Sequence, residues 1–209
     1  PVLNRAFDRR KAEKDLKRYY KKGIDKEGKV LFDFLKNKMA DLRVLDIGCG
    51  IGNLAIELVK AGASNSRGVD ISEAYIAAAR NLAKNLDIAD IVEFQAMDFV
   101  ENERKIEKVD VVVSNKVICC YPYMERFIRA STSHAKKFYA ITYPVDHSAV
   151  RFFVRIRNWF IQFTVKRGFK VHIHNVAEIT KCIESQGFKG VFSAKKRFWI
   201  VDVFERRIL

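Results

Sequence analysis

The chain alternates short apolar runs with longer segments in which apolar residues recur at helical spacing. The short runs are typical of buried strands and occupy residues 43–47, 66–69, 92–95, 109–114 and 138–142. Segments with the spacing of amphipathic helices lie between them, at 54–61, 73–85 and 124–134. Strands that alternate with helices in this way predict an α/β fold, with right-handed crossovers and a parallel sheet covered on both faces.

The C-terminal part of the chain breaks this alternation. A helix predicted at 176–186 is followed by two strands, 188–194 and 198–204, with only residues 195–197 between them. A connection this short can join only antiparallel strands. The predicted sheet is therefore mostly parallel, with an antiparallel final strand.

The first forty residues (1–40) predict a helical arm or cap ahead of the main domain. A charged helix fits residues 4–20, with Gly23 in the role of its C-cap, and a second helix fits 28–39. Residues 41–209 then form one α/β domain, which carries an inserted amphipathic helix within about 145–172.

Composition places the chain among globular proteins with one domain and an elaboration. Of 209 residues, 49% are apolar and only 3 are proline, which favours a large core over disorder. No apolar run is long enough to span a membrane, and the charged N-terminus does not resemble a secretory signal. The 4 cysteines form no disulfide framework, so we expect a reduced, cytoplasmic protein.

The charge of this basic protein is concentrated in two segments. The net charge is +14, to which residues 1–30 contribute +6 and residues 136–170 contribute +7, whereas residues 31–135 sum to −2. Basic surfaces attract nucleic acid, anionic lipid or acidic small molecules. Lysine-rich helix faces also keep a protein soluble, so the charge alone selects none of these partners.

A glycine cluster between a strand and a helix carries the strongest chemical signal. Gly48, Gly50 and Gly52 let the chain turn sharply and let a ligand lie against bare backbone. A dinucleotide fingerprint needs a further glycine where Asn53 stands, which disfavours a nicotinamide cofactor. Asp46, just before the cluster, would repel a pyrophosphate and attract a cationic ligand.

Two more aspartates follow the next strands of the predicted sheet. Asp70 ends the second strand, at a distance along the chain typical of a carboxylate that binds both ribose hydroxyls. Asp98 follows the third strand and can accept a hydrogen bond from the adenine amine, with Met97 and Phe99 as apolar neighbours of the ring. Carboxyl ends of parallel strands share one edge, so these groups predict a single ligand crevice.

The chain resembles the class I S-adenosylmethionine-dependent methyltransferases in the order of its motifs. These are Asp-Ile-Gly-Cys-Gly-Ile-Gly at 46–52, Val-Asp-Ile-Ser at 69–72 and Met-Asp-Phe at 97–99, followed by an antiparallel end strand. The resemblance covers about residues 40–204. It implies a Rossmann-like seven-stranded sheet with helices on both faces, and S-adenosylmethionine as cofactor. The glycines would then cradle the methionine part, Asp46 its amino group, Asp70 the ribose and Asp98 the adenine. The cofactor-binding residues predicted on this basis are Asp46, Gly48, Cys49, Gly50, Gly52, Asn53, Asp70, Ile71, Met97, Asp98, Phe99, Asn115 and Tyr20.

The end of the fourth strand narrows the class of methyl acceptor. Families that methylate an amide or an adenine amine carry Asn-Pro-Pro-Tyr here, whereas this chain has Asn115 followed by Lys116. The general layout has a weaker similarity to the O-methyltransferases that esterify a magnesium-porphyrin carboxylate. We therefore predict methyl transfer to an oxygen of a small, largely apolar acceptor, with anionic acceptors included.

A carboxylate acceptor needs no general base, whereas a hydroxyl or a phenol does. His147 and Asp146, just after the fifth strand, are the candidate catalytic bases, and Tyr121 is a candidate orienting hydroxyl, as is Tyr143. A structural role remains the alternative for each of them.

Two further groups of residues suggest no separate chemistry. His172 and His174 share one face of an extended segment, but no third ligand stands at a recognisable spacing, so we predict no metal site. The adjacent Cys119 and Cys120 are interpreted as packing residues, since a free cysteine behaves as a small buried hydrophobe.

The predicted helix at 149–166 is more apolar than packing on one face of a sheet requires. Its polar residues form one narrow stripe, consisting of Arg151, Arg155, Asn158, Gln162 and Lys166. The remaining surface predicts contact with a small-molecule acceptor, as a lid over its site, which we favour. A partner subunit, a peripheral membrane surface or simple burial remain open.

Two other functions compete with a small-molecule methyltransferase. An RNA methyltransferase would use the basic surface, but the sequence carries no recognisable RNA-binding module. A non-catalytic scaffold with this fold would have no reason to keep aspartates at 46, 70 and 98.

Overall fold

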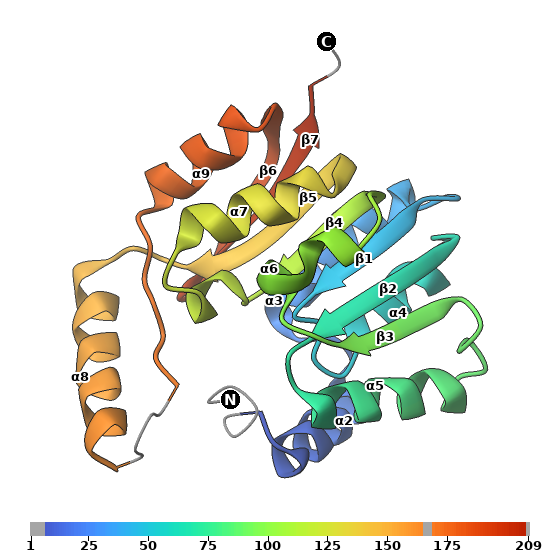
Figure 1. Cartoon of the computed structure of the whole chain (residues 1–209), viewed down its shortest axis with the longest axis horizontal. Coiled ribbons are helices and arrows are strands. Elements are labelled where there is room, and N and C mark those ends of the chain that lie inside the picture. The colour runs from blue at the N-terminus through green and yellow to red at the C-terminus, as the bar shows by residue number, and fades with distance from the viewer. Residues whose placement is uncertain (1–6, 165–168, 208–209) are drawn as a thin grey trace.

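The computed structural model describes residues 7–164 and 169–207, with the backbone alone for 162–164. Its centre is a seven-stranded sheet with the order β3-β2-β1-β4-β5-β7-β6 (Figure 1). The strands are β1 (Arg43–Ile47), β2 (Asn65–Asp70), β3 (Val92–Ala96), β4 (Val109–Asn115), β5 (Ala135–Pro144), β6 (Phe188–Lys196) and β7 (Trp199–Arg206).

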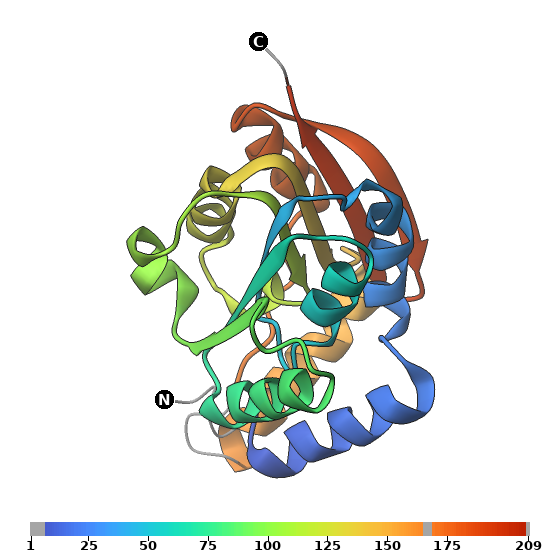
Figure 2. The ribbon, with the colours of Figure 1, turned by 90° about the vertical axis from the view of Figure 1, so that its right-hand side faces the viewer.

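Alternate residues of the strands enter two separate cores, as the two-residue repeat of a strand requires. In β4, Val111 and Val113 belong to one core and Val112 to the other. Figure 2 shows α3 and α4 on one side of the sheet and α6 and α7 on the other. The helices of the first core are α3 (Lys26–Leu35), α4 (Asn53–Lys60) and α5 (Glu73–Asn85). Those of the second are α6 (Phe99–Asn102), α7 (Met124–Ser133) and α9 (Val176–Ser185).

The antiparallel end of the sheet confirms the hairpin that the sequence predicted. β7 lies between β5 and β6 and runs antiparallel to both, with Tyr139 opposite Phe204 in the first pair. Arg197 makes the turn between the two strands, with φ at +52°. The fold is therefore a mostly parallel, Rossmann-like sheet with helices on both faces.

The N-terminal helices are joined closely to this core. The first described helix, α2 (Arg9–Lys22), ends at Gly23, whose N–H donates to Tyr19 O over 2.8 Å. The predicted start of this helix, at residues 4–6, lies outside the described residues. α3 is shorter than predicted, because a 3₁₀ turn (Lys36–Lys38) follows it. α3 buries Leu31 and Leu35 in the first core, and α2 packs on α5.

The amphipathic segment after β5 forms α8 (Ser148–Thr164), which stands apart from the sheet layers in Figure 1. The predicted last residues of this helix, 165 and 166, lie outside the described part of the chain. Residues 169–175, the return segment, then lead to α9 without regular secondary structure. Within 7–164 and 169–207, no helix combines the length and hydrophobicity needed to cross a membrane.

Candidate functional site

The candidate site lies at the point of the sheet where the strand order reverses, between β1 and β4. β2 and β3 extend the sheet from β1 to one side, and β4 and β5 extend it to the other. Ligands of open α/β sheets bind at such a switch point, beyond the carboxyl ends of the strands. A pocket of about 340 Å³ opens here, within the range of small-molecule sites. The predicted residues that line it are Asp46, Gly48, Cys49, Gly50, Asn53, Asp70, Ile71, Met97, Phe99, Asn115 and Tyr121.

The glycine loop takes backbone conformations that other residues rarely adopt. Gly48 has φ at +69°, and its N–H donates to Val69 O over 2.7 Å. A Cβ at this position would lie 2.2 Å from a methyl carbon of Val117. Gly50 also has a positive φ, and its N–H donates to the Asp70 carboxylate over 3.0 Å. The loop therefore presents bare backbone to the pocket and ties β1 to the end of β2.

Gly52 has a different role from the one predicted. It does not line the pocket and has φ at +74° at the N-cap of α4. A Cβ there would lie 2.3 Å from the ring of Phe94. Gly52 therefore allows α4 and its loop to approach β3 closely.

Two of the three predicted carboxylates face the pocket. Asp70 accepts hydrogen bonds from the N–H groups of Gly50 and of Ser72, the latter over 2.9 Å. Burial raises the pKa of Asp70, although these backbone hydrogen bonds oppose the rise. Asp46 is only 2% exposed, and burial together with the neighbouring Asp70 raises its pKa to about 7.

One buried hydrogen-bond acceptor in the pocket lining, Asn115 Oδ1, receives no donor from the protein. Asn115 uses its amide N–H groups on Asp25, over 3.3 and 3.4 Å, while its buried Oδ1 has no hydrogen-bond partner. The buried Asp46 carboxyl lies in the same lining. A buried acceptor without a partner is costly, and a cationic donor would satisfy Asn115 Oδ1 and stabilise the ionised form of Asp46. The site thus fits a ligand with an ammonium group.

The N-terminal helix α2 and the segment just before it supply part of the lining, but through other residues than the predicted Tyr20. Phe7, Lys11, Asp15 and Arg18 all line the pocket. Asp15 accepts a hydrogen bond from the hydroxyl of Tyr75 over 2.6 Å and pairs with Arg18 at 3.4 Å. Residues 11, 15 and 18 fall on one helix face, but the spacing alone does not indicate which part of the protein that face meets.

Tyr20 is not brought to the pocket. Its side chain is 59% exposed and lies beside a surface groove between α2 and α5. Its neighbour Tyr19 turns inward instead and donates to Glu57 over 2.5 Å. Successive helical residues are 100° apart, so only one of the two tyrosines can face the body.

Asp98 does not line the pocket either. Its carboxylate caps α6 by accepting the N–H of Val100 over 3.1 Å. It also accepts a hydrogen bond from the hydroxyl of Tyr121 over 3.3 Å, and Tyr121 does line the pocket. Asp98 therefore reaches the site only through that tyrosine.

The predicted catalytic bases lie away from the pocket. Neither Asp146 nor His147 is in its lining, and Asp146 pairs with Arg151 at the start of α8, with a 2.7 Å hydrogen bond. This hydrogen bond lowers the pKa of Asp146. Tyr121 is in the lining, but burial and the Asp98 carboxylate raise its pKa, so its hydroxyl stays protonated and can only donate or orient. Tyr143 is buried and donates to Asp202.

The return segment, residues 169–175, forms hydrogen bonds with the turn at residues 118–121 that follows β4. The N–H of His172 donates to Cys119 O over 2.8 Å, and His174 Nε2 lies 3.0 Å from Tyr121 O. Burial of His172, with the nearby His174 and a lysine, lowers its pKa. Cys119 is buried as a packing residue, while Cys120 reaches the pocket lining.

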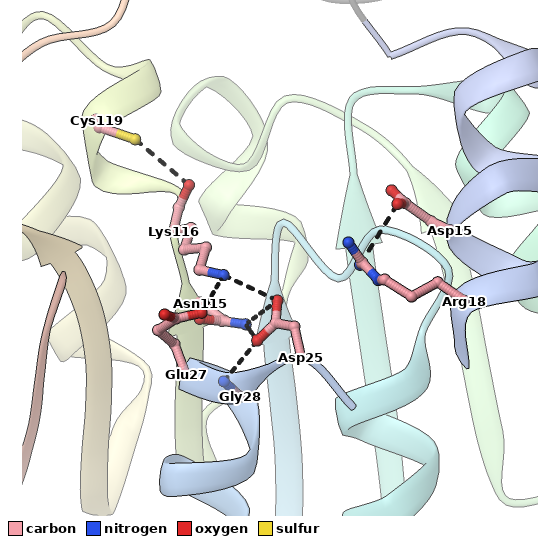
Figure 3. Close-up of polar contacts among 8 residues, drawn as sticks. All are labelled: Asp15, Arg18, Asp25, Glu27, Gly28, Asn115, Lys116 and Cys119. Atoms are coloured by element: carbon pink, nitrogen blue, oxygen red, sulfur yellow. Dashed lines mark hydrogen bonds and ion pairs between the residues drawn. The ribbon is translucent and has the colours of Figure 1, made fainter. Parts of the chain in front are cut away.

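Lys116 links β4 to the N-terminal helices through a cluster of charges (Figure 3). Its ammonium lies 3.1 Å from Asp25 Oδ2 and 2.6 Å from Glu27 Oε2. Burial raises the pKa of Asp25, but the charge of Lys116 and hydrogen bonds from Gly28, Lys116 and Asn115 outweigh it, so the net pKa is lowered. The cluster places Asp25 at the N-cap of α3 beside the pocket.

Lys116→Met should lower the free energy of unfolding at neutral pH by about 2 kcal/mol, because two carboxylates would lose their cation. A lowered pKa contributes stability above the ordinary value of 3.8, and that stability is lost as the pH falls through the folded-state pKa. The deficit should therefore shrink below pH 4. Urea unfolding across this pH range measures it. Lys29→Met, which removes an exposed partner of Asp33, is the control and should change stability little.

Fold and pocket together define an α/β protein with a ligand crevice at the switch point of a Rossmann-like sheet. A family profile for the methyltransferase domain matches residues 38–184. The fold is similar to magnesium protoporphyrin IX methyltransferase from Synechocystis PCC 6803, solved with bound SAH, with a TM-score of 0.71, 23% identity and 86% and 82% of the two chains covered. An O-methyltransferase family protein from Burkholderia thailandensis gives a TM-score of 0.70 at 14% identity, over 96% of this chain and 61% of that one.

Sequence relatives point to the same family. Ribosomal protein L11 methyltransferase from Haemophilus influenzae (strain PittEE) is 40% identical over 78 residues, which is 37% of this chain and 25% of the relative. The chain thus spans about a quarter of the length of the curated relatives it matches. Since the family profile covers well over half of the chain, the protein belongs to the class I S-adenosylmethionine-dependent methyltransferases.

Proposed function

We propose that the protein transfers the methyl group of S-adenosylmethionine to a carboxylate oxygen of a small, largely apolar acceptor. The cofactor is that of the family. When bound, it would supply a sulfonium methyl group: the acceptor oxygen would bond to the methyl carbon in line as the S–CH3 bond breaks and S-adenosylhomocysteine leaves, so positioning provides much of the acceleration.

The pocket residues fit the cofactor in named roles. We assign its ammonium group to Asn115 Oδ1, a buried acceptor without a partner, and to the buried Asp46 carboxyl, whose ionised form a cation would favour. Asp70 would accept the ribose hydroxyls from its place beside the glycine loop. Met97 and Phe99 would cover the adenine ring as apolar walls.

One observation carries the choice of a carboxylate as acceptor. Among the described residues, the pocket lining contains no histidine, and its tyrosines, Tyr75 and Tyr121, have raised pKa values because they are buried and donate to aspartates. Asp15 and Asp25 are engaged with basic side chains. An acceptor that arrives already ionised needs no base from the protein.

The size of the pocket supports a small acceptor. The lining is mixed in charge, with Lys11, Arg18 and Lys116 beside four aspartates, at 15, 25, 46 and 70. The pocket of about 340 Å³ is roofed by Phe7 and α2, which leaves it at the small end of ligand sites. One protein of similar fold is named for a small-molecule acceptor, magnesium protoporphyrin IX, which supports an acceptor of that size class.

The test is methyl transfer from S-adenosylmethionine labelled in its methyl group. A panel of apolar carboxylic acids is compared with the corresponding alcohols and phenols. We expect label only with the acids, and alkaline hydrolysis should release it as methanol because the product is an ester. Asp70→Ala, which should not bind the cofactor, serves as the inactive control.

Other outcomes would contradict the proposal in distinguishable ways. Alkali-stable label on alcohols would require a general base, and so a catalytic role for one of the lining aspartates that we assign to the cofactor or to ion pairs. Label on RNA or on ribosomal protein would favour a macromolecular acceptor, the class named for the L11 methyltransferase relatives. Tight binding of S-adenosylhomocysteine with no product from any acceptor would favour a non-catalytic scaffold.

A further inference from the structure

Helix α8 carries its large apolar side chains on its outer surface. The exposed fractions are 61% for Phe152, 69% for Phe153, 46% for Ile156, 58% for Trp159 and 59% for Phe160. Most helices of a globular protein bury such a face against the core. A contiguous exposed apolar surface of this kind marks an interaction site.

The orientation of α8 explains this exposure. At 100° per residue, the five exposed side chains fall within an arc of about 120°. The half-buried residues Val154, Asn158 and Ile161 lie on the opposite side of the helix. Asn158 holds that side to the return segment, since its amide donates to Val171 O over 2.8 Å and accepts the Val171 N–H over 3.1 Å. The apolar arc therefore faces away from the body of the protein.

Arginines border this apolar arc on both edges. On the helical wheel, Arg155 falls about 40° before the first apolar residue of the arc and Arg157 about 40° after the last one. Both side chains are exposed, and the helix sequence Ser148–Thr164 contains no acidic residue. The surrounding segment, residues 136–170, carries a net charge of +7.

We propose that α8 docks the protein on the surface of an anionic lipid membrane. A helix with aromatic residues on one side and arginines at its edges lies in the plane of the interface, with its apolar face below the headgroups and its cations among the phosphates. The described part of α8 is about 25 Å long, and no described helix could span a bilayer, so α8 would lie on the membrane. A second copy of this chain fits less well, because two faces bordered by arginines would meet with like charge.

The docking surface is independent of the methyl-transfer site. None of the described α8 residues lines the pocket, so the structure does not support the predicted role of this helix as a lid over the acceptor. The docking proposal can therefore fail while the proposed activity holds, and the reverse is equally true.

The test is flotation of the full chain with vesicles of phosphatidylcholine alone and with vesicles in which phosphatidylglycerol replaces a third of the lipid. We expect binding to the anionic vesicles, weakened by salt. Phe152→Gln combined with Ile156→Gln should weaken binding at least about tenfold, since it removes apolar contacts at the centre of the arc. Arg155→Glu should weaken it as well, and Lys189→Glu, an exposed charge reversal on β6, should have much less effect.

A matched apolar control and a spectroscopic readout complete the design. Tyr123→Gln with Ile91→Gln removes two exposed apolar side chains from other parts of the surface and should leave vesicle binding unchanged. In a Trp199→Phe background, the emission of Trp159 should shift to the blue with anionic vesicles only, because the chain has 2 tryptophans. Equal binding by all variants, or no binding, would overturn the proposal. A Trp159 shift that follows protein concentration without vesicles would also overturn it, in favour of self-association.

Discussion

Replacing Asp70 by alanine is expected to weaken S-adenosylhomocysteine binding by at least about 100-fold while the protein stays folded. Asp70 is the carboxylate that both shapes the glycine loop and faces the pocket, through its bonds to the N–H groups of Gly50 and Ser72. Its loss removes the group that we propose as the acceptor for the ribose hydroxyls, and it frees the Gly50 N–H. Calorimetric titration measures the affinity, and thermal unfolding measures the stability.

A second variant separates the two roles of Asp70. Asp70→Asn keeps an oxygen for the loop but loses the charge and one acceptor, so we expect a smaller but still severe loss, of about tenfold or more. Asp33→Ala, an exposed aspartate paired with lysines on and just after α3, is the control and should bind normally. Normal affinity in Asp70→Ala would show that the ligand lies elsewhere.

The sheet and the glycine loop could be predicted because their signals are local. The run of valines indicates the buried strand β4, and the glycines at 48, 50 and 52 indicate backbone with positive φ. Both signals lie within a few residues of sequence. The three-residue connection at 195–197 permitted only a hairpin, and the register of β6 and β7 bears this out. Strand ends fixed the edge at which Asp46 and Asp70 meet.

The roof of the pocket could not be predicted because it depends on how distant segments pack. Nothing local to α2 states that Asp15 will meet Tyr75, sixty positions along the chain. The Lys116 cluster likewise joins the end of β4 to the start of α3. Asp146 and His147 were placed near the crevice from their position after β5, but the longer β5 and its link to α8 carry them away from it.

Asp46→Asn is expected to act in opposite directions on stability and on cofactor binding. The folded-state pKa of Asp46 is raised to about 7 from an ordinary value of 3.8, chiefly by burial. A carboxyl group whose pKa is raised by folding binds its proton more tightly in the folded state, so its stabilising effect is greatest at low pH and is lost as the pH rises through 7. At pH 8 the asparagine variant should therefore be more stable than the wild type, by about 2–4 kcal/mol, and below pH 4 the two should converge.

Binding of S-adenosylhomocysteine should show the reverse. Its ammonium group favours the ionised form of Asp46, so wild-type affinity should rise with pH up to about 7 and then level off. In Asp46→Asn the affinity should be lower throughout and lose this pH dependence. Urea unfolding and calorimetric titration from pH 5 to 8 measure both effects, with Asp110→Asn at the opposite end of β4 as the matched control. Because a merely structural Asp46 would alter stability without altering the pH profile of binding, the two measurements together decide whether this buried carboxylate holds the cofactor.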